Sequence, residues 1–226
     1  MKIRWYGHAA FGLFPKDGPS IITDPYLPDL VGYAPIPETA DLVITSSDDD
    51  DGHCRADLVP GTPQVLNALD LLKTGGKGEV AGLEITAMEA MEWEHHPDHE
   101  IPGQNAMYRF TLDGIRIAHM GDVGNRLTDE QMAFYEDVDV LLALTGGGLT
   151  IKLPDLMEMI HIQKPKLVIP MHFRTLTYKP RRSHWIEGFL ANFHDAQVDF
   201  AFGYDAEVTK ESLPDSTRVL VMDYMR

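Results

Sequence analysis

Short apolar runs separated by glycine or proline fill the first part of the chain. Residues 2–6, 9–14 and 20–24 each read as a short strand, because apolar and aromatic side chains concentrate there between turn residues. The segment 25–37 carries four prolines and is expected to be a loop. Apolar residues return at 41–46, which reads as a buried strand. The N-terminal part is therefore predicted to be rich in β-structure.

Beyond residue 60 the pattern predicts helices between strands. Strands are expected at 79–93, 105–121, 138–144, 166–170, 206–210 and 218–224, and helices at 62–72, 128–135, 154–163 and 183–193. Asp113-Gly114 is typical of a hairpin turn, and Thr128 with Gln131 forms a capping box. Ser183 is the expected cap of the last helix.

This order of elements favours an α/β (α+β) fold, a four-layer αββα sandwich in which helices cover the outer faces of two sheets. A three-layer α/β sandwich is the alternative that periodicity alone leaves open. No repeat or low-complexity linker divides the chain, so residues 1–226 are expected to form a single domain.

The composition narrows the class of partner. The formal net charge of -16 argues against nucleic acid, because phosphate binding needs clustered Lys and Arg. No apolar run approaches the roughly 18 residues of a membrane span, and the N-terminus lacks the apolar core of a signal peptide. The single cysteine, Cys54, excludes an intramolecular disulfide and fits a reducing compartment. We therefore expect a cytoplasmic protein that acts on a small molecule, without nucleic acid or membrane.

An acidic cluster directly follows the strand at 41–46. It reads Asp48-Asp49-Asp50-Asp51-Gly52-His53, and its four consecutive carboxylates repel one another unless a cation or water neutralises them. A divalent metal would offset that repulsion, because hard cations prefer oxygen ligands. The alternative is a solvated acidic turn, since runs of like charge usually face water.

Further polar residues follow other predicted strands, in loops, where functional groups usually lie. The candidate ligands are Asp49, Asp51, His53, one of His95, His96 and His99, then Asp122 and His172. Gly121 before Asp122 allows the backbone to approach a site closely. A lone histidine after a strand is more often a structural group, but acidic and histidine loops at successive strand ends indicate one shared site.

These stretches resemble the metallo-β-lactamase-fold hydrolases, and within them the branch similar to ascorbate-6-phosphate lactonase. The matching stretches are Gly7-His8-Ala9-Ala10-Phe11, Ile22-Thr23-Asp24-Pro25-Tyr26, Ala40-Asp41-Leu42-Val43-Ile44, His119-Met120-Gly121-Asp122-Val123-Gly124, Gly146-Gly147-Gly148-Leu149-Thr150 and Pro165-Lys166-Leu167-Val168-Ile169-Pro170-Met171-His172. They occur in the family's order. The resemblance implies the αββα sandwich, with a metal site at one edge between the two sheets.

The first metal-binding loop of that family reads H-x-H-x-D-H, and this chain departs from it. Ser47 stands at the first histidine position and Asp49 at the second. Asp51 keeps the aspartate, Gly52 replaces the last histidine, and His53 lies one residue later, where it is a candidate substitute. The signature is therefore degenerate.

The resemblance implies one or two divalent ions. One would take Asp49, Asp122 and His95 or His96, and the other Asp51, Asp122 and His172, with His53 as a candidate fourth ligand. Such a set is rich in oxygen, which suits Mn²⁺ or Mg²⁺ better than the histidine-rich zinc site usual in the family, although Zn²⁺ stays a candidate. We predict one well-held ion rather than two.

If a metal binds, hydrolysis is the expected reaction. The ion lowers the pKa of its bound water from about 16 toward about 7, which gives a nucleophilic hydroxide at neutral pH. Asp51 and His53 are the candidate catalytic residues, with Asp51 orienting the water or accepting its proton. His8, Asp24 and His119 are candidates for orienting the ligands by hydrogen bonds. For His8 and His119 the alternative is a hydrogen-bonded core histidine.

A local basic cluster, Lys179, Arg181 and Arg182, is a candidate for binding a substrate phosphate or carboxylate, and its alternative is a solvated loop. The leading hypothesis is a metal-dependent hydrolase of a small ester, lactone or phosphorylated metabolite. The alternative is a weak or inactive member that kept the fold to bind a ligand or partner, as the missing histidines suggest. A homo-oligomer is expected from the branch, without a surface pattern that shows it.

Overall fold

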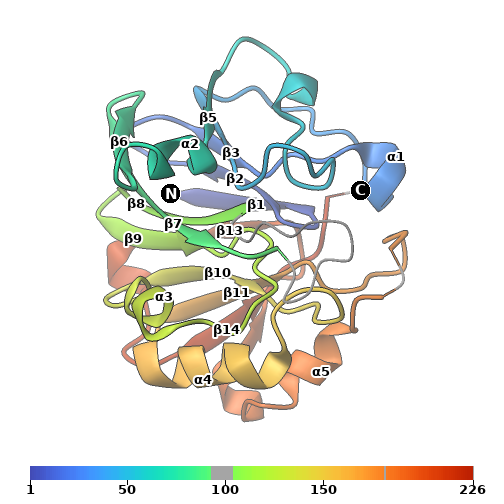
Figure 1. Ribbon diagram of the computed structural model, residues 1–226. Coiled ribbons are helices and arrows are strands. Elements are labelled where there is room, and N and C mark those ends of the chain that lie inside the picture. Colours follow the sequence, from blue (N-terminus) through green and yellow to red (C-terminus); the bar gives the residue numbers. More distant parts are fainter. Residues whose placement is uncertain (93–103, 181, 226) are drawn as a thin grey trace.

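Two β-sheets packed face to face form the centre of the molecule (Figure 1). The computed structural model describes residues 1–92, 104–180 and 182–225. Within these residues the first sheet has six strands in the order β13-β1-β2-β3-β4-β5, and the second has eight in the order β12-β14-β11-β10-β9-β8-β7-β6. This arrangement confirms the predicted two-sheet sandwich.

The strands and helices have the following bounds. The first sheet contains β1 (Lys2–Gly7), β2 (Ala10–Phe14), β3 (Ile21–Thr23), β4 (Leu42–Thr45), β5 (Gln64–Asn67) and β13 (Asp205–Glu207). The second contains β6 (Lys77–Val80), β7 (Leu83–Ala90), β8 (Asn105–Leu112), β9 (Ile115–His119), β10 (Val140–Leu144), β11 (Leu167–Met171), β12 (Val198–Phe200) and β14 (Arg218–Val221). The helices are α1 (Pro28–Val31), α2 (Ala68–Leu72), α3 (Asp129–Ala133), α4 (Leu153–Gln163) and α5 (Ile186–Leu190), with 3₁₀ turns at Ala56–Leu58, Asp195–Gln197 and Lys210–Ser212.

Strand direction brings several loops to one edge of the sandwich. β3 and β4 run parallel in the first sheet, as β9, β10 and β11 do in the second. β1 and β3 are each antiparallel to β2, so they point the same way. Because the carboxyl ends of parallel strands meet at one edge, the segments after β1, β3, β4, β9 and β11 start close to one another.

Alternation along the strands of the first sheet separates two apolar layers. In β1, Ile3 and Trp5 pack in the main core between the sheets, whereas Tyr6 packs in a second cluster on the other face. In β4, Ile44 belongs to the main core and Val43 to the second cluster. This period of two is the one expected for side chains of a strand, so β1 and β4 are buried on both faces.

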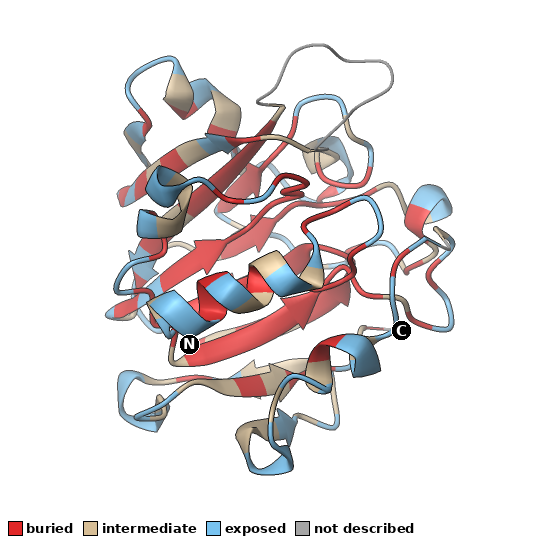
Figure 2. Ribbon diagram, turned by 60° about the horizontal axis from the view of Figure 1, so that its bottom comes forward, coloured by how far each residue is buried: buried red, intermediate tan, exposed pale blue. Residues whose placement is uncertain are grey.

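The outer layers of the sandwich differ from each other. The proline-rich segment 25–37 and the short α1 cover the first sheet, where Tyr26, Val31, Tyr33 and Ile36 are buried. On the second sheet α4 buries Leu156, Met159 and Ile160, an i, i+3, i+4 spacing that places them on one face of the helix. Figure 2 shows this buried face of α4 turned toward the buried strands of the sheet.

The sequence predictions match most elements, with several differences. The expected strand at 79–93 is two strands, β6 and β7, and the expected loop at 25–37 contains the short α1. The predicted helix at 62–72 is a strand, β5, followed by the short α2, because Gln64–Asn67 pairs in parallel with β4. The last helix starts after Trp185 rather than at a Ser183 cap. β12 was missed. Among the described residues, no helix is long and apolar enough to cross a membrane.

Asp139, at the start of β10, is a buried carboxylate held by basic groups. It accepts hydrogen bonds from Arg116 N and Nε, both 3.0 Å away, and from Lys210 Nζ at 3.0 Å. Burial alone would raise the pKa of Asp139, but the bonds from Arg116 and Lys210 hold that pKa well below its usual range. The carboxylate therefore stabilises the fold while it is ionised.

We expect Asp139→Asn to lower the free energy of unfolding by about 1–3 kcal/mol at pH 7, because it weakens these buried bonds. The pKa is depressed on folding, so the contribution is complete above the unfolded value of about 3.9 and falls as the pH drops below it. Denaturant unfolding at pH 7 and about pH 3.5 checks this. Asp199→Asn, at an exposed pair with Arg218, is the matched control and should change little. An Asp139→Asn effect equal at both pH values would contradict the prediction.

Candidate metal centre

Polar residues from the loops after β1, β3, β4, β9 and β11 gather at one edge between the sheets. Three of them have positive φ angles although they are not glycine: His8 at 52°, Asp24 at 38° and His172 at 60°. Such backbone conformations cost of order 1 kcal/mol or more each and tend to cluster at functional sites. The surrounding contacts must therefore hold these three residues in place.

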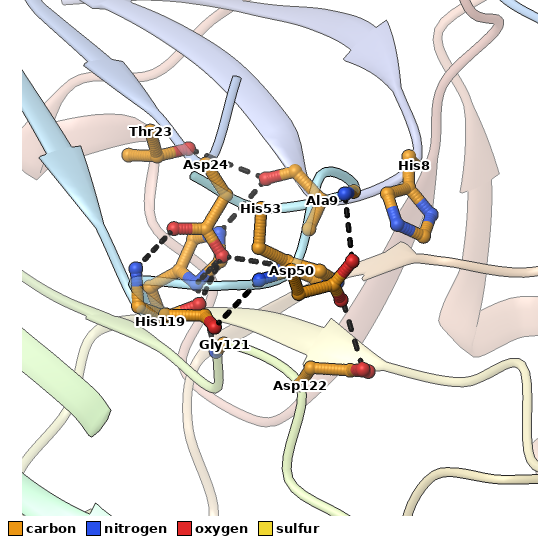
Figure 3. Close-up of polar contacts among 12 residues, drawn as sticks. His8, Ala9, Thr23, Asp24, Asp50, His53, His119, Gly121 and Asp122 are labelled. Carbon is orange, nitrogen blue, oxygen red and sulfur yellow. Dashed lines mark hydrogen bonds and ion pairs between the residues drawn. The ribbon is translucent and has the colours of Figure 1, made fainter. Parts of the chain in front are cut away.

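The carboxylate of Asp24, directly after β3, is the hub of the hydrogen bonds at this edge. Ser46 donates to it from its backbone N at 2.9 Å and from its hydroxyl at 2.6 Å. His53 Nδ1 lies 2.8 Å from Oδ2, and Tyr108 donates to Oδ1 at 3.3 Å. In Figure 3 the dashed lines converge on Asp24, with Asp50, Asp122 and His8 to its right. Burial alone would raise the pKa of Asp24, but His119 and His53 lower it, so the group is ionised.

His119, the last residue of β9, uses both of its ring nitrogens within the protein. Its Nδ1 accepts a hydrogen bond from Gly121 N at 2.9 Å, so its Nε2 carries the proton and donates to the carbonyl of Ala9 at 2.9 Å. A histidine with both nitrogens bound has no lone pair left for a metal. His119 therefore supports the loop at Gly121, as expected for a positioning residue.

His53 is different, because only one of its ring nitrogens has a hydrogen-bond partner. Asp24 fixes Nδ1 as the donor, so Nε2, which points away from Asp24, is the nitrogen that can bind a metal once its proton is displaced. This Nε2 is buried without a hydrogen-bond partner, 3.8 Å from Asp50 Oδ2 and 3.7 Å from Asp122 Oδ2. A carboxylate that orients a histidine whose other nitrogen is free is the arrangement found around metal ions.

A turn after β4 aims Asp50 and His53 at the same point. Asp50 Oδ1 accepts from Gly52 N at 2.7 Å, and the Asp50 carbonyl accepts from His53 N at 2.8 Å. This is an Asx turn, in which the side chain of an aspartate mimics the backbone. It closes the acidic cluster so that one carboxylate faces inward.

Asp122 and His172 complete the cluster from the second sheet. The backbone N–H of Asp122 donates a hydrogen bond to Asn105 Oδ1 at 2.8 Å, and Gly121 has a φ of +62°. Both features fix the turn after β9. His172 Nε2 lies 3.4 Å from Asp122 Oδ1, an atom that is buried without a hydrogen-bond partner. His8 stands beside them, with its ring centroid 4.0 Å from that of His172.

Two groups of ligand atoms could hold a metal ion among the described residues. They are His8, His53 and His172, and Asp50, His53 and Asp122, with the atoms of each group within 4.8 Å of one another. The donor separations of 3.4–3.8 Å quoted above are close to the roughly 3.3 Å between ligands of a tetrahedral zinc ion. Buried polar atoms normally have hydrogen-bond partners, so ligand atoms that lack them, such as His53 Nε2 and Asp122 Oδ1, favour a metal site.

The charges and burial of these groups favour binding of a cation among them. Burial raises the pKa of Asp122 to about 7, and burial lowers that of His172 to about 3, since neither charged form is solvated there. Burial opposes the charge on His53 too, but Asp122 and Asp24 outweigh it and raise its pKa to about 10. In the folded chain alone, a proton on His53 is the positive charge that Asp122 and Asp50 attract, and a divalent ion would replace it.

Comparison with known proteins assigns the family. Residues 2–172 match the family model described as the beta-lactamase superfamily domain. The chain belongs to the metallo-β-lactamase superfamily. A solved structure from Thermotoga maritima, described as a proposed zinc-dependent hydrolase of this superfamily, is 30% identical, covers 99% of both chains and has a TM-score of 0.76.

Other relatives of this superfamily member agree. A metal-dependent hydrolase from Carboxydothermus hydrogenoformans is 28% identical over an alignment of 196 residues, which covers 77% of this chain and 85% of the relative. A structure from Parabacteroides distasonis, described as a proposed metal-dependent hydrolase, covers 99% of this chain and 93% of its own with a TM-score of 0.65. At 17% identity it supports the fold alone.

The four aspartates of the degenerate signature loop differ in exposure and in the direction of their carboxylates. Asp50 faces the cluster, whereas Asp51 is exposed and pairs with Arg55 at 3.3 Å. Asp49 is also exposed, and its carboxylate accepts from the Ser47 hydroxyl at 3.3 Å. The structure thus brings together His53, Asp122 and His172 of the predicted ligands, with Asp50 in place of Asp49 and Asp51.

The remaining predicted residues lie elsewhere. Lys179 is exposed, and its Nζ donates to the carbonyl of Asp29 at 2.5 Å, while Arg182 is exposed as well. His95, His96, His99 and Arg181 fall outside the described residues. The substrate-binding role of the basic cluster thus stays a prediction.

Sequence reasoning missed Asp50 and Glu92. The Asp-x-Gly spacing of an Asx turn points to Asp50. The family signature instead aligned Asp49 and Asp51 with the ligand positions, so Asp50 was passed over. Glu92 lies two residues after β7. Burial raises the pKa of its carboxyl group to about 8, and the negative charges of Asp122 and Asp50 contribute to the increase. Its carboxyl group is therefore near the same cluster, and only its position after a strand could have suggested this.

We expect Asp24→Ala to lower the free energy of unfolding of chelator-treated protein by about 3–5 kcal/mol, since it leaves His53 and Ser46 without their buried partner. Asp57→Ala is the matched control, because Asp57 pairs with Arg55 at the surface and should contribute about 0–1 kcal/mol. Denaturant unfolding of both variants measures the difference. Equal effects would show that Asp24 is not the hub described here.

Proposed function

We propose that this protein is a metal-dependent hydrolase of a small ester or lactone, and that Asp50, His53, Asp122 and His172 hold its metal ion. The observation that carries the proposal is the set of buried donor atoms without partners, His53 Nε2 and Asp122 Oδ1, which face Asp50 and His172. Relatives described as metal-dependent hydrolases support it.

Each residue has a distinct task in this proposal. A divalent ion held by these residues would supply Lewis acidity, which would polarise a carbonyl oxygen and make water more acidic. Asp24 holds the proton of His53 on Nδ1 and so keeps Nε2 available as a ligand. Asp122 offers both carboxylate oxygens, one toward His53 and one toward His172.

A carboxylate of the cluster is the natural acceptor of the proton that water loses. Glu92 is a candidate, because burial raises the pKa of its carboxyl group and the charges of Asp122 and Asp50 raise it further, so this group lies within electrostatic reach of the cluster. Asp51, the acceptor predicted from the sequence, is tied to Arg55 at the surface. We therefore propose that the acceptor role falls to a residue inside the cluster.

Tyr178 forms one wall beside the metal cluster. It is buried, and its ring centroid lies 5.4 Å from that of His8 and 6.0 Å from that of His172. Burial raises the pKa of Tyr178, and Asp122 raises it further, so the hydroxyl keeps its proton at neutral pH. A neutral phenol near the metal can donate a hydrogen bond to a substrate oxygen.

The charges around the cluster favour an ester or lactone over a phosphorylated metabolite. The ion pairs that the described residues give Asp50 and Asp122 are with His53 and His172. Lys179 donates instead to the backbone carbonyl of Asp29. Of the ion pairs that the described residues form with Asp50 and Asp122, none brings a Lys or Arg to balance a phosphate dianion, whereas a neutral carbonyl needs no further cation.

The proposal predicts that protein purified without added metal, or loaded with Zn²⁺ or Mn²⁺ and desalted, retains about one equivalent of metal by mass spectrometry. Asp122→Asn should retain less than about a tenth of that, because it removes a charged ligand, and its ester or lactone hydrolysis should fall at least 100-fold. Asp51→Asn is the matched control and should keep both.

A chain that never retains metal would contradict the proposal. It would favour the alternative function, a superfamily member that binds a ligand or partner without catalysis, which the departures at Ser47, Asp49 and Gly52 already suggest. Full metal retention without hydrolysis of any ester, lactone or phosphorylated substrate would favour that alternative as well.

A further inference from the structure

His8 is the polar residue of this region that the proposed function leaves without a task. It forms the turn between β1 and β2, is 4% exposed, and has a buried Nδ1 without a hydrogen-bond partner. His119, equally buried, has partners for both nitrogens. In Figure 3 no dashed line reaches the His8 ring. A structural histidine in a core is normally satisfied, so the ring requires another explanation.

We propose that His8 is a direct metal ligand, and that it replaces the histidine that the signature loop lacks at Gly52. This inference rests on the proposed function and adds a ligand from a different part of the chain. The ligand nitrogens of His8, His53 and His172 lie within 4.8 Å of one another. The ring centroid of His8 is 4.0 Å from His172 and 4.7 Å from His53.

Gly52 clears the space that the His8 ring occupies. The φ of Gly52 is not in the positive range, so its backbone does not require glycine. A Cβ atom at this position would lie 2.9 Å from His8 Nε2, closer than real Cβ contacts, and 3.1 Å from Asp50 Oδ1, which is tight. Any side chain at position 52 would therefore displace the His8 ring from its observed place, so the glycine and this position of His8 go together.

The backbone of His8 is fixed as a ligand's should be. Its φ of 52° places the residue in the left-handed region, and its carbonyl accepts hydrogen bonds from Trp5 Nε1 at 3.1 Å and His172 N at 3.0 Å. The second bond joins the two histidines across the sheets, so their rings keep one relative position. A strained, anchored residue of this kind is typical of a preorganised site.

Among the ligands that the described residues supply, His53 favours one ion rather than two. Both ligand groups contain His53, whose Nδ1 is committed to Asp24, so the single Nε2 lone pair binds one metal. The ion then lies among three histidines, with Asp50 and Asp122 as oxygen ligands. Three imidazoles make the set richer in nitrogen than the sequence predicted, and this favours Zn²⁺ over Mg²⁺.

The test compares Zn²⁺ affinity, by competition with a chromophoric chelator, and the visible absorption of Co²⁺-loaded protein. We expect His8→Ala to weaken Zn²⁺ binding at least about 100-fold, more than a hydrogen-bonding neighbour of a ligand usually does. Its Co²⁺ spectrum should change, and free imidazole should restore the spectrum and the affinity. His161→Ala, at an exposed histidine of α4, is the matched control and should bind both metals as the native chain does.

His8→Phe keeps the ring volume and removes the nitrogens, so it should lose Zn²⁺ affinity as His8→Ala does. Wild-type affinity and an unchanged Co²⁺ spectrum in either folded His8 variant would overturn the inference, as would a defect in His8→Ala that imidazole does not restore. Asp122→Asn distinguishes the two levels of failure. If the native chain binds Zn²⁺, Asp122→Asn loses it and the His8 variants keep it, His8 is not a ligand while the proposed function stands. If the native chain binds no Zn²⁺, the proposed function itself fails.

Discussion

The buried carboxylate of Asp24 is the interaction on which the rest of this edge depends. It joins the end of β3 to Ser46 after β4, to Tyr108 of the second sheet and to His53 of the signature loop. These bonds compensate the cost of burying a charge and fix the tautomer of His53. These bonds hold the acidic loop after β4 against the sheets, although the aspartates of the loop repel one another.

Much of the fold could be predicted from the sequence, because buried strands leave a strong apolar pattern. β1 to β4, β10 and β11 are apolar on both faces or alternate clearly, so the runs at 2–6, 9–14, 20–24, 41–46, 138–144 and 166–170 identified them. β5 was not recognisable, since Gln64–Asn67 is largely exposed and becomes a strand only by pairing with β4. Tertiary pairing overrode the local signal there.

The location of the site could be predicted from the sequence, but the identity of its ligands was harder to predict. Asp122 and His172 follow parallel strands, so their approach to one edge follows from topology. Among four consecutive aspartates the chemistry is the same, and only the Asx turn closed by Gly52 selects Asp50. His8 was predicted as a supporting residue, because its missing partners and its fit against Gly52 are visible only in three dimensions.

Charge balance explains why the departures from the superfamily signature need not abolish the site. Two carboxylates and three histidines surround one small region, and no Lys or Arg takes part in the ion pairs described for Asp50 and Asp122. The loss of signature histidines is thus matched by donors from the turn after β1 and from the shifted loop. The substitution of ligands, rather than decay of the site, is the account we favour.

The most direct test is a crystal structure of the Zn²⁺-loaded protein, with anomalous diffraction recorded on both sides of the zinc absorption edge. The account predicts one anomalous peak about 2.0–2.2 Å from His53 Nε2 and from carboxylate oxygens of Asp50 and Asp122, with His8 and His172 around it. No peak in this region, or a peak bound only by the exposed Asp49 and Asp51, would contradict it.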